Sequence, residues 1–455
     1  MNNKLFPVRA AFVGFGEVNT PMEFLTGRCQ DAVNVLRQRG VEVLAAPIVR
    51  DDPEGKLAAD AIAVIQSHDF DALVVCVAGW IPSWAVIKTI EPFKHKPILL
   101  WGQSGWYDDG HFVTTADQAG TTALRHPLQE MGFNLKYLVN FKGSRSRDDE
   151  AAAFIHVAAA SRWLRQAVIG MCGYRDMRLY GTMYDGTALK AAIGPEIEHL
   201  DLLEIQSIAQ TIPAAEIAAA SSDLQKRWHF TRPPQPGTVE NSVRLALAFQ
   251  RKIIERGYQA FSFCDVDGVK KLLQFAPAGA LTYLHDLIDI PTVPENDSYG
   301  AVTQLILRAL TGTTPAYLEF YEFTEKSALM GVPDYVPAAI VSGQVTVMPN
   351  AFGSFGEGLL NVSKLKTGPV TISRLARSGN RFVMHCVKGE ATTPETWEEA
   401  GWAPPAPQLP SLEVAFEGHA DDFLSNVLGQ HYILTYGNQQ HLLAEYCRLN
   451  GIDRL

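Results

Sequence analysis

The sequence predicts an α/β protein with two doubly wound α/β domains followed by a β-rich C-terminal domain that is barrel-like. The first observation is a regular alternation of short apolar segments and amphipathic segments over the first hundred residues. The second is the return of this alternation after residue 167. The third is a change after residue 310, where segments rich in β-branched and aromatic residues are bounded by Gly and Pro. We therefore predict domains at residues 1–167, 168–310 and 311–455.

Strands and helices alternate in the predicted N-terminal domain. Four continuous apolar segments predict buried strands, at Val8–Phe15, Val41–Pro47, Ala72–Ala78 and Pro97–Trp101. Three segments between them have helical spacing, at Pro21–Arg39, Leu57–Ser67 and Pro82–Ile90. Short, fully apolar strands joined by helices are typical of a parallel sheet that is covered on both faces. Ligands of such sheets bind beyond the carboxyl ends of the strands.

The later parts of the chain differ from each other in pattern. Alternation predicts the central domain, with one helix at Ser242–Arg256 and a buried helix at Ala301–Leu310. The segments "AYLEFYEF", "QVTVMPN", "PVTISRLA" and "RFVMHCVKG" instead have the composition of strands. We expect them to form an antiparallel sheet or barrel. A short strand at His431–Tyr436 and a helix at Gln439–Asn450 are predicted near the C-terminus.

Bulk composition bounds the class of protein. The chain has 455 residues, is 47% hydrophobic and 19% charged, and carries a net charge of −10. Its Lys and Arg residues are dispersed, so we do not expect a nucleic-acid partner. The sequence has no run of about 18 uncharged apolar residues, which argues against a membrane span. The six cysteines are scattered without a CxxC pair, and the first residues have the pattern of a strand rather than of a signal peptide, so we expect a cytoplasmic protein.

The segment "PENDSYG" places polar side chains before the predicted helix Ala301–Leu310. Asn, Asp and Ser favour helix N-termini, where they accept hydrogen bonds from free N–H groups, and acids suit the positive end of the helix dipole. Capping alone therefore explains the segment. The alternative is that Glu295 binds a ligand, while Asn296, Asp297 and Ser298 cap the helix and orient that carboxylate.

Two further residues are candidates for the same site. Glu319 shares one face of a predicted strand with Tyr317 and Tyr321, because side chains alternate along a strand. A solvated strand face is the simpler interpretation. His431 precedes an apolar strand, where a structural hydrogen bond is the commoner role. Together with Glu295 they would supply two carboxylates and one imidazole, which suit Mn²⁺, Co²⁺, Fe²⁺ or Mg²⁺ better than structural zinc. The spacing alone does not show that the three residues meet.

The segment "ENDSYGAVTQLILRALTGTTPAYLEFYEF" resembles the part of the L-fucose isomerases that carries two metal-binding acids. The segment "GQHYILTYGNQQHLLAEYCRLNGI" resembles the part of that family that supplies a histidine ligand. The segment "GPVTISRLARSGNRFVMHCVKGEA" resembles a strand pair of the family's C-terminal domain. The chain is therefore identified as a distant, shorter member of the superfamily of L-fucose and L-arabinose isomerases. The resemblance implies that Glu295, Glu319 and His431 bind the metal and that Glu295 and Glu319 are catalytic.

The resemblance also implies contacts with a substrate. Trp80, in "CVAGWIPSW", lies where the family has a loop that reaches the site of a neighbouring subunit, although it could equally be a hydrophobic loop anchor. Arg175 and Met177, in "CGYRDM", lie where the family supplies substrate contacts, and Gln430 precedes the metal histidine. Two positions depart from the family, which usually has Asp in place of Glu319 and Asn in place of Gln430.

The function implied by the resemblance is that of a divalent-metal-dependent aldose–ketose isomerase. Such an enzyme is an intramolecular oxidoreductase that acts on an open-chain sugar through an enediol intermediate. The family assembles as trimers or hexamers, so a homo-oligomer is implied as well.

Three alternatives stay open from the sequence. The first is an isomerase for a charged, sulfonated or acidic hexose, in which Arg175 or Lys270 would face the anion. The second is a metal-dependent epimerase or aldolase, because the same enediolate chemistry serves all three reactions. The third is a two-lobed sugar-binding protein without activity. Proteins of that kind lack a β-rich domain that carries acids and a histidine.

Overall fold

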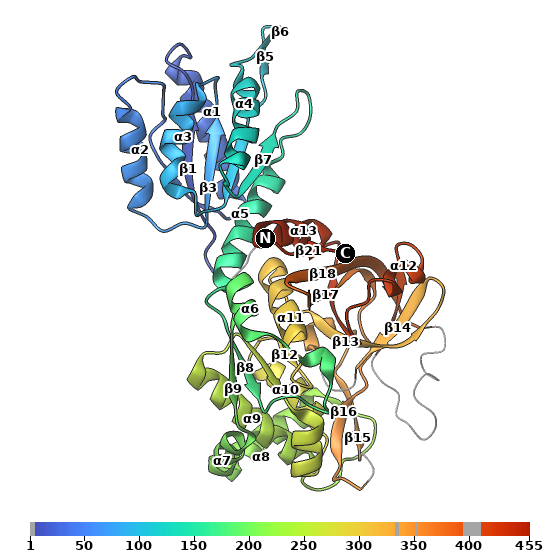
Figure 1. The fold of residues 1–455 in the computed structure, drawn as a ribbon. Helices are drawn as coiled ribbons and strands as arrows, with labels where there is room; N and C mark the ends of the chain where they lie inside the picture. The colour runs from blue at the N-terminus through green and yellow to red at the C-terminus, as the bar shows by residue number, and fades with distance from the viewer. Residues whose placement is uncertain (1–4, 333–335, 352–353, 395–410) are drawn as a thin grey trace. The chain divides into compact units, whose positions relative to one another are not determined.

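The computed structural model describes residues 5–332, 336–351, 354–394 and 411–455. The chain divides into two compact units, Met1–Trp163 and Leu164–Leu455 (Figure 1). Helices and strands are mixed in the described part, so the predicted α/β class is confirmed. None of the helices within the described ranges is both long enough and apolar enough to cross a membrane.

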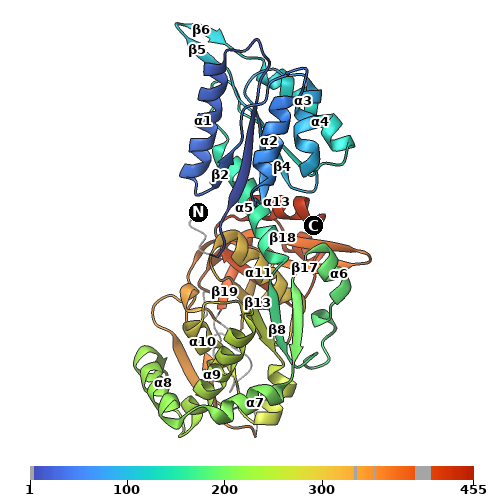
Figure 2. The same ribbon diagram turned by 90° about the vertical axis from the view of Figure 1, so that its left-hand side faces the viewer.

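The first unit is built on a five-stranded parallel sheet with the strand order β2-β1-β3-β4-β7. Its strands are β1 Arg9–Phe15, β2 Glu42–Ala45, β3 Ala72–Val77, β4 Ile98–Gly102 and β7 Leu135–Val139. Its helices are α1 Met22–Gln38, α2 Lys56–Gln66, α3 Ser83–Ile90, α4 Asp117–Glu130 and α5 Asp148–Leu164. Figure 2 shows α1 on one side of this sheet and α2, α3 and α4 on the other. Burial on both faces explains why β3 has no exposed residue.

The second unit begins with a four-stranded parallel sheet in the order β12-β11-β8-β9. Its strands are β8 Val168–Cys172, β9 Glu196–Leu200, β11 Ala260–Phe263 and β12 Thr292–Val293. The accompanying helices are α6 Gly186–Ala192, α7 Leu202–Thr211, α8 Ala214–Arg227, α9 Thr238–Arg256, α10 Ala278–Leu287 and α11 Ser298–Thr311. Residues 298–310 of α11 are all buried, as expected for a helix that is covered on every side.

A closed barrel of six antiparallel strands follows. Its order is β17-β20-β13-β14-β19-β18, and pairing of β18 with β17 closes the ring. The strands are β13 Ala316–Phe323, β14 Ser327–Gly331, β17 Gly368–Ser378, β18 Arg381–Thr392, β19 Ser411–Phe416 and β20 His431–Tyr436. Two short elements, β21 Asp453–Arg454 and α13 Gln440–Asn450, pack against β18. The prediction of a β-rich, barrel-like region is therefore confirmed.

One predicted strand of the C-terminal region lies outside this barrel. Strand β15 (Thr346–Asn350) pairs with β10 (His229–Phe230) and with β16 (Gly358–Asn361) in a separate three-stranded sheet. Local composition predicts that a segment forms a strand, but the choice of partner depends on contacts far apart in the chain. The division of residues 164–455 into two domains at residue 310 stays a prediction.

The barrel has an aromatic inside and a helix on its outside. Phe423, in α12 (Ala420–Leu424), has its ring centre 5.3 Å from that of Phe320, 5.2 Å from that of Tyr432 and 4.8 Å from that of His385. Helix α11 packs against β13, β17 and β20. Because side chains alternate along a strand, the neighbours of Phe320 and Tyr432 in sequence face α11 instead. That outer wall carries the candidate site.

The buried histidine of the barrel interior should make stability depend on pH. The side chain of His385 is hydrogen-bonded to the Tyr432 hydroxyl, with 2.7 Å between Nδ1 and the oxygen, and burial lowers its pKa from 6.5 to about 4. The unfolded chain therefore binds a proton between pH 6.5 and pH 4 that the folded chain excludes, so acid destabilises the fold. We expect wild-type protein to lose about 1 to 2 kcal/mol more stability than His385→Gln between pH 7 and pH 5. Urea unfolding at both pH values measures the difference, and equal losses would contradict the assignment.

Candidate functional site

The candidate site lies where the N-terminus of α11 meets the outer wall of the barrel. Strands β13 and β20 are antiparallel neighbours, and their register sets Glu319 directly opposite His431. Tyr317, two residues earlier on β13, stacks on the imidazole of His431 with 4.4 Å between ring centres. The predicted shared face of Tyr317 and Glu319 is thus the face that looks toward α11, not a solvated one.

The structure brings the three predicted ligands together. Glu295 Oε2 lies 3.7 Å from His431 Nδ1, and Glu319 Oε2 lies 3.5 Å from His431 Nε2. The imidazole is almost fully buried, whereas 12% of the Glu295 side chain and 23% of the Glu319 side chain are exposed. Glu295 is 24 positions before Glu319, and Glu319 is 112 positions before His431, yet both carboxylates lie beside the imidazole ring of His431. Their roles as ligands and catalysts stay predictions.

The donor set fits a cation, but the arrangement is not that of a bound metal. The two carboxylates face different nitrogens of His431, so they do not converge on one point. Within the described ranges, no group of three or more His, Cys, Asp or Glu side chains is already arranged to hold a metal ion. However, His431 Nε2 is buried and has no hydrogen bond. A buried nitrogen of this kind is costly unless it gains a partner. Coordination by all three residues requires a change of rotamer in Glu295 or in the imidazole.

The backbone before α11 is strained in a way that directs Glu295. Glu295 and Asn296 are consecutive non-glycine residues with positive φ, at 64° and 48°. Such conformations cost energy and persist only where the surroundings impose them. Asn296 Nδ2 donates to the carbonyls of Cys172 (2.9 Å) and Tyr174 (2.6 Å), and Glu295 N donates to Asp265 Oδ1 (2.9 Å). The loop is therefore tied to the parallel sheet on one side and aims Glu295 at the barrel on the other.

Asp297 connects the helix to two barrel strands. It is the N-cap of α11 and accepts a hydrogen bond from Gly300 N at 3.0 Å, which confirms the predicted capping. Its carboxylate also accepts a hydrogen bond from the Tyr317 hydroxyl at 2.9 Å and pairs with both terminal nitrogens of Arg374 at 2.5 and 2.8 Å. Burial raises the pKa of Asp297, but the charge and hydrogen bonds of Arg374 lower it more, so the net shift is downward. The Asp297–Tyr317 bond thereby holds the ring that supports His431.

Arg374 was not predicted from the sequence as part of the site. It is buried in β17, between Ser373 and Leu375 in the segment "VTISRLA". It lies within six consecutive buried positions, where an arginine needs an acidic partner. The signal in the sequence was an arginine in a segment with the composition of a strand. The identity of that partner, 77 residues away, depends on the packing of α11 against the barrel.

The predicted substrate contacts fall into three places. Gln430 is exposed and lines the same cleft as His431 and Arg374. Arg175 lies in the loop after β8 and lines an adjoining cleft. Met177, in the same loop, is 37% exposed, has a φ of 45° and lines neither cleft. Lys270 is paired with Asp265 at 3.1 Å, beneath the Glu295 loop.

Trp80 lies in the first unit, three residues after the end of strand β3, and 39% of it is exposed. Its backbone N–H donates to Thr115 O at 2.8 Å, which ties the loop to the segment before α4. The side chain is thus displayed at the carboxyl edge of the sheet instead of anchoring the loop in a core. Its predicted role in a neighbouring subunit's site stays a prediction.

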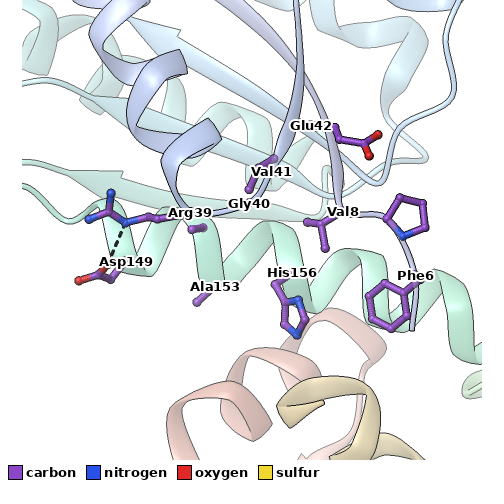
Figure 3. A pocket seen from close by; sticks show the side chains of 11 residues that line it. Phe6, Val8, Arg39, Gly40, Val41, Glu42, Asp149, Ala153 and His156 are labelled. Carbon is purple, nitrogen blue, oxygen red and sulfur yellow. Dashed lines mark hydrogen bonds and ion pairs between the residues drawn. The ribbon is translucent and has the colours of Figure 1, made fainter. Parts of the chain in front are cut away.

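A recess in the first unit is a weaker candidate for a site. It lies between the start of β1, the start of β2 and helix α5, and it is lined by Phe6, Val8, Arg39, Val41 and His156, among others (Figure 3). Arg39 is already paired with Asp149 at 2.8 Å. This recess is at the amino ends of the strands, whereas ligands of parallel sheets bind at the carboxyl ends.

The comparisons with known proteins do not identify the chain. No protein-family model matches it, and no curated protein matches it. A solved structure of an ABC transporter solute-binding protein from Burkholderia multivorans, with an unknown ligand, is 10% identical. The similarity covers 68% of this chain and 95% of that chain with a TM-score of 0.18. A score this low supports no conclusion about fold or function.

Removal of Arg374 should destabilise the second unit far more than removal of its neighbour Arg377. Arg374→Met leaves the Asp297 carboxylate buried without its cation, which typically costs about 3 to 5 kcal/mol. Arg377 pairs with Asp185 at a more exposed position, where an ion pair contributes little, so Arg377→Met should have only a small effect. Chemical unfolding curves of both variants measure the costs. Similar, small costs for both would show that the buried pair does not hold the site together.

Proposed function

We propose that this protein is a divalent-metal-dependent aldose–ketose isomerase that acts on an open-chain sugar. The observation that carries the proposal is the meeting of two carboxylates with one buried imidazole, at distances of 3.7 and 3.5 Å. The loop that carries Glu295 and the strands that carry Glu319 and His431 are separate elements of the chain, and His431 is far from both acids in sequence. Packing that gathers like charges around a ring is expensive unless a cation or a proton is bound there.

The three side chains would hold the ion, with Mn²⁺ as the expected metal and Co²⁺, Fe²⁺ or Mg²⁺ as alternatives. When bound, a divalent ion supplies Lewis-acid chemistry that polarises a carbonyl group and stabilises negative charge on oxygen. Glu295 and Glu319 together carry charge −2 when ionised, which matches the charge of such an ion. The stacking of Tyr317 on His431 would keep the imidazole plane fixed while the ligand binds.

The same carboxylates would move the proton. In the proposed reaction one carboxylate takes the proton from the carbon next to the carbonyl of the sugar and returns it to the neighbouring carbon. The other assists transfer between the two oxygens through an enediol intermediate. Both are partly exposed beside a buried ring, so both carboxylates are accessible from the surface. The assignment of the two roles between Glu295 and Glu319 is left open.

The proposal includes membership in the superfamily of L-fucose and L-arabinose isomerases. It also includes a cytoplasmic, homo-oligomeric assembly of three-domain subunits, either a trimer or a hexamer. What supports membership is the agreement between the segments that resemble this family and the elements that meet at the site, namely the start of α11, β13 and β20. Trp80 would then contact the site of a neighbouring subunit, and Gln430 and Met177 would contact the sugar.

An epimerase or aldolase that uses the same site is the remaining enzymatic alternative. These reactions share deprotonation next to a carbonyl and differ in the bond that forms afterwards. A non-enzymatic sugar-binding protein is less well supported, because such a protein has no need for paired carboxylates around a histidine.

Metal binding should depend on all three residues. Glu295→Gln, Glu319→Gln and His431→Ala should each weaken binding of Mn²⁺ by more than about 100-fold, beyond the 10- to 100-fold typical of an outer partner of a ligand. Glu322→Gln, at an exposed position of the same strand, and His419→Ala, also exposed, are matched controls that should bind normally. Metal analysis after dialysis against each ion measures the content. Retention of metal by all three variants would show that Glu295, Glu319 and His431 do not form the metal site.

Conversion of an aldose to a ketose should require the same acids. Wild-type protein loaded with Mn²⁺ should form a ketose from at least one sugar in a panel of neutral and charged aldoses. Glu319→Gln should lower kcat by about 100-fold or more, as expected for loss of an acid–base group, and Glu322→Gln should not. Detection of ketose by chromatography is the measurement. Cleavage products or an epimer instead of a ketose would favour the alternative reactions.

A further inference from the structure

A second cleft adjoins the candidate metal site at the carboxyl ends of β8 and β9. Its wall includes Tyr174, Arg175, Tyr184, His199, Asn296 and Ser298. It shares Thr182 with the cleft that His431 lines. Ser298 Oγ donates to Thr182 O at 2.9 Å, so the loop after β8 is fastened to the start of α11. The position matches the place where ligands bind in doubly wound sheets.

The charge of this cleft is opposite to that of the chain. The protein has 49 Asp and Glu against 39 Lys and Arg, a net charge of −10, yet the lining of the cleft contains an arginine and a histidine and no acid. The metal site next to it contains two glutamates. The cleft holds about 10 Å³, room for one water-sized group, so only the tip of a ligand bound at the metal site can enter it, and that tip meets a cation.

Arg175 is the source of the positive charge, and its contacts are neutral. Its guanidinium lies 5.0 Å from the centre of the Tyr180 ring, and Nη1 lies 3.3 Å from Met183 Sδ. No acid in the described part of the chain forms an ion pair with it. Lys270, the other cation considered for an anionic ligand, is already paired with Asp265. Of the two cations considered, Arg175 is thus the one that no acid neutralises within the described residues.

The opposite wall is held rigid by hydrogen bonds between neutral groups. His199 Nδ1 lies 2.9 Å from Gly173 O, and because a carbonyl only accepts, this nitrogen carries the proton. His199 Nε2 lies 3.1 Å from the Tyr184 hydroxyl and accepts its hydrogen bond. The ring of Tyr184 stacks on that of His199 with 6.1 Å between centres. These hydrogen bonds use neutral groups and leave Arg175 without a counter-ion.

We propose that the substrate of this site carries an anionic group at the end remote from the reacting carbons, and that Arg175 binds that group. A carboxylate, a phosphate or a sulfonate would each fit, because a guanidinium pairs with all three through two parallel hydrogen bonds. The inference rests on the proposed isomerase for the identity of the reacting end. The anion site itself is defined by Arg175 and the cleft, so it can be tested without turnover.

The test is a calorimetric titration of the protein with four probes. D-glucuronate, D-glucose 6-phosphate and 6-deoxy-6-sulfo-D-glucose present the three anions, and D-glucose is the neutral reference. At least one anionic probe should bind ten or more times tighter than D-glucose. Arg175→Gln should reduce the affinity for that probe to the level of D-glucose, whereas Arg178→Gln, at an exposed position of the same loop, should change it less than twofold.

Two results would overturn the inference. One is equal binding of D-glucose and all three anionic probes to the wild-type protein, and the other is an anion preference that survives in Arg175→Gln. Glu319→Gln separates this inference from the proposed function, because it should lower kcat for isomerisation by about 100-fold or more and keep the preference for the anion. An anion preference without any isomerisation by the wild-type protein would refute the isomerase and leave the anion site standing.

Discussion

The buried pair of Asp297 and Arg374 is the interaction on which the candidate site depends. A charge pair with both side chains at most 3% exposed is stable only if the geometry is good and the remaining hydrogen bonds are satisfied. Here the pair is bidentate, and Asp297 also accepts hydrogen bonds from Gly300 N and the Tyr317 hydroxyl. Arg374 Nη2 also donates to Gly181 O at 3.3 Å, whereas Arg374 Nε has no hydrogen bond within the described residues. One carboxylate thus joins the start of α11 to strands β13 and β17. A Cβ at position 300 would lie 2.5 Å from Asp297 Oδ2, which explains the glycine in the first turn of the helix.

The site is positioned by two rigid bodies rather than by its own loop. The parallel sheet holds Asn296 through the carbonyls at the end of β8, and the barrel holds Glu319 and His431 through strand register. Glu295 lies between the sheet and the barrel, and its backbone has a left-handed conformation with a φ of 64°. Strain of this kind is found at sites where a side chain must be held in one direction. The same loop borders the cleft of Arg175, so the two proposed binding sites share a wall.

The local hydrophobic pattern of the sequence predicted many of the helices and strands, but it did not predict which strands pair with each other. Apolar runs placed β1, β3 and β20 within a few residues of their observed bounds, because these strands are buried on both faces. Helical spacing placed α1, because one face of this helix is buried and the other is exposed. The pairing of β15 with β10 depends on distant contacts that no local pattern contains. Within the site, Glu295, Glu319 and His431 were found through resemblance to a family, not through spacing. Arg374 and the cleft of Arg175 depend on the packing of α11 and on the loop after β8, which only the structure defines.

The most direct measurement of the central claim is a crystal structure of the protein with Mn²⁺ and a sugar alcohol. The account predicts one ion bound by the carboxylates of Glu295 and Glu319 and by one nitrogen of His431, at about 2 Å from each. Two vicinal oxygens of the sugar alcohol should face the same position. Crystals grown with excess Mn²⁺ in which Glu295 and Glu319 still flank opposite nitrogens of an uncoordinated His431 would contradict it.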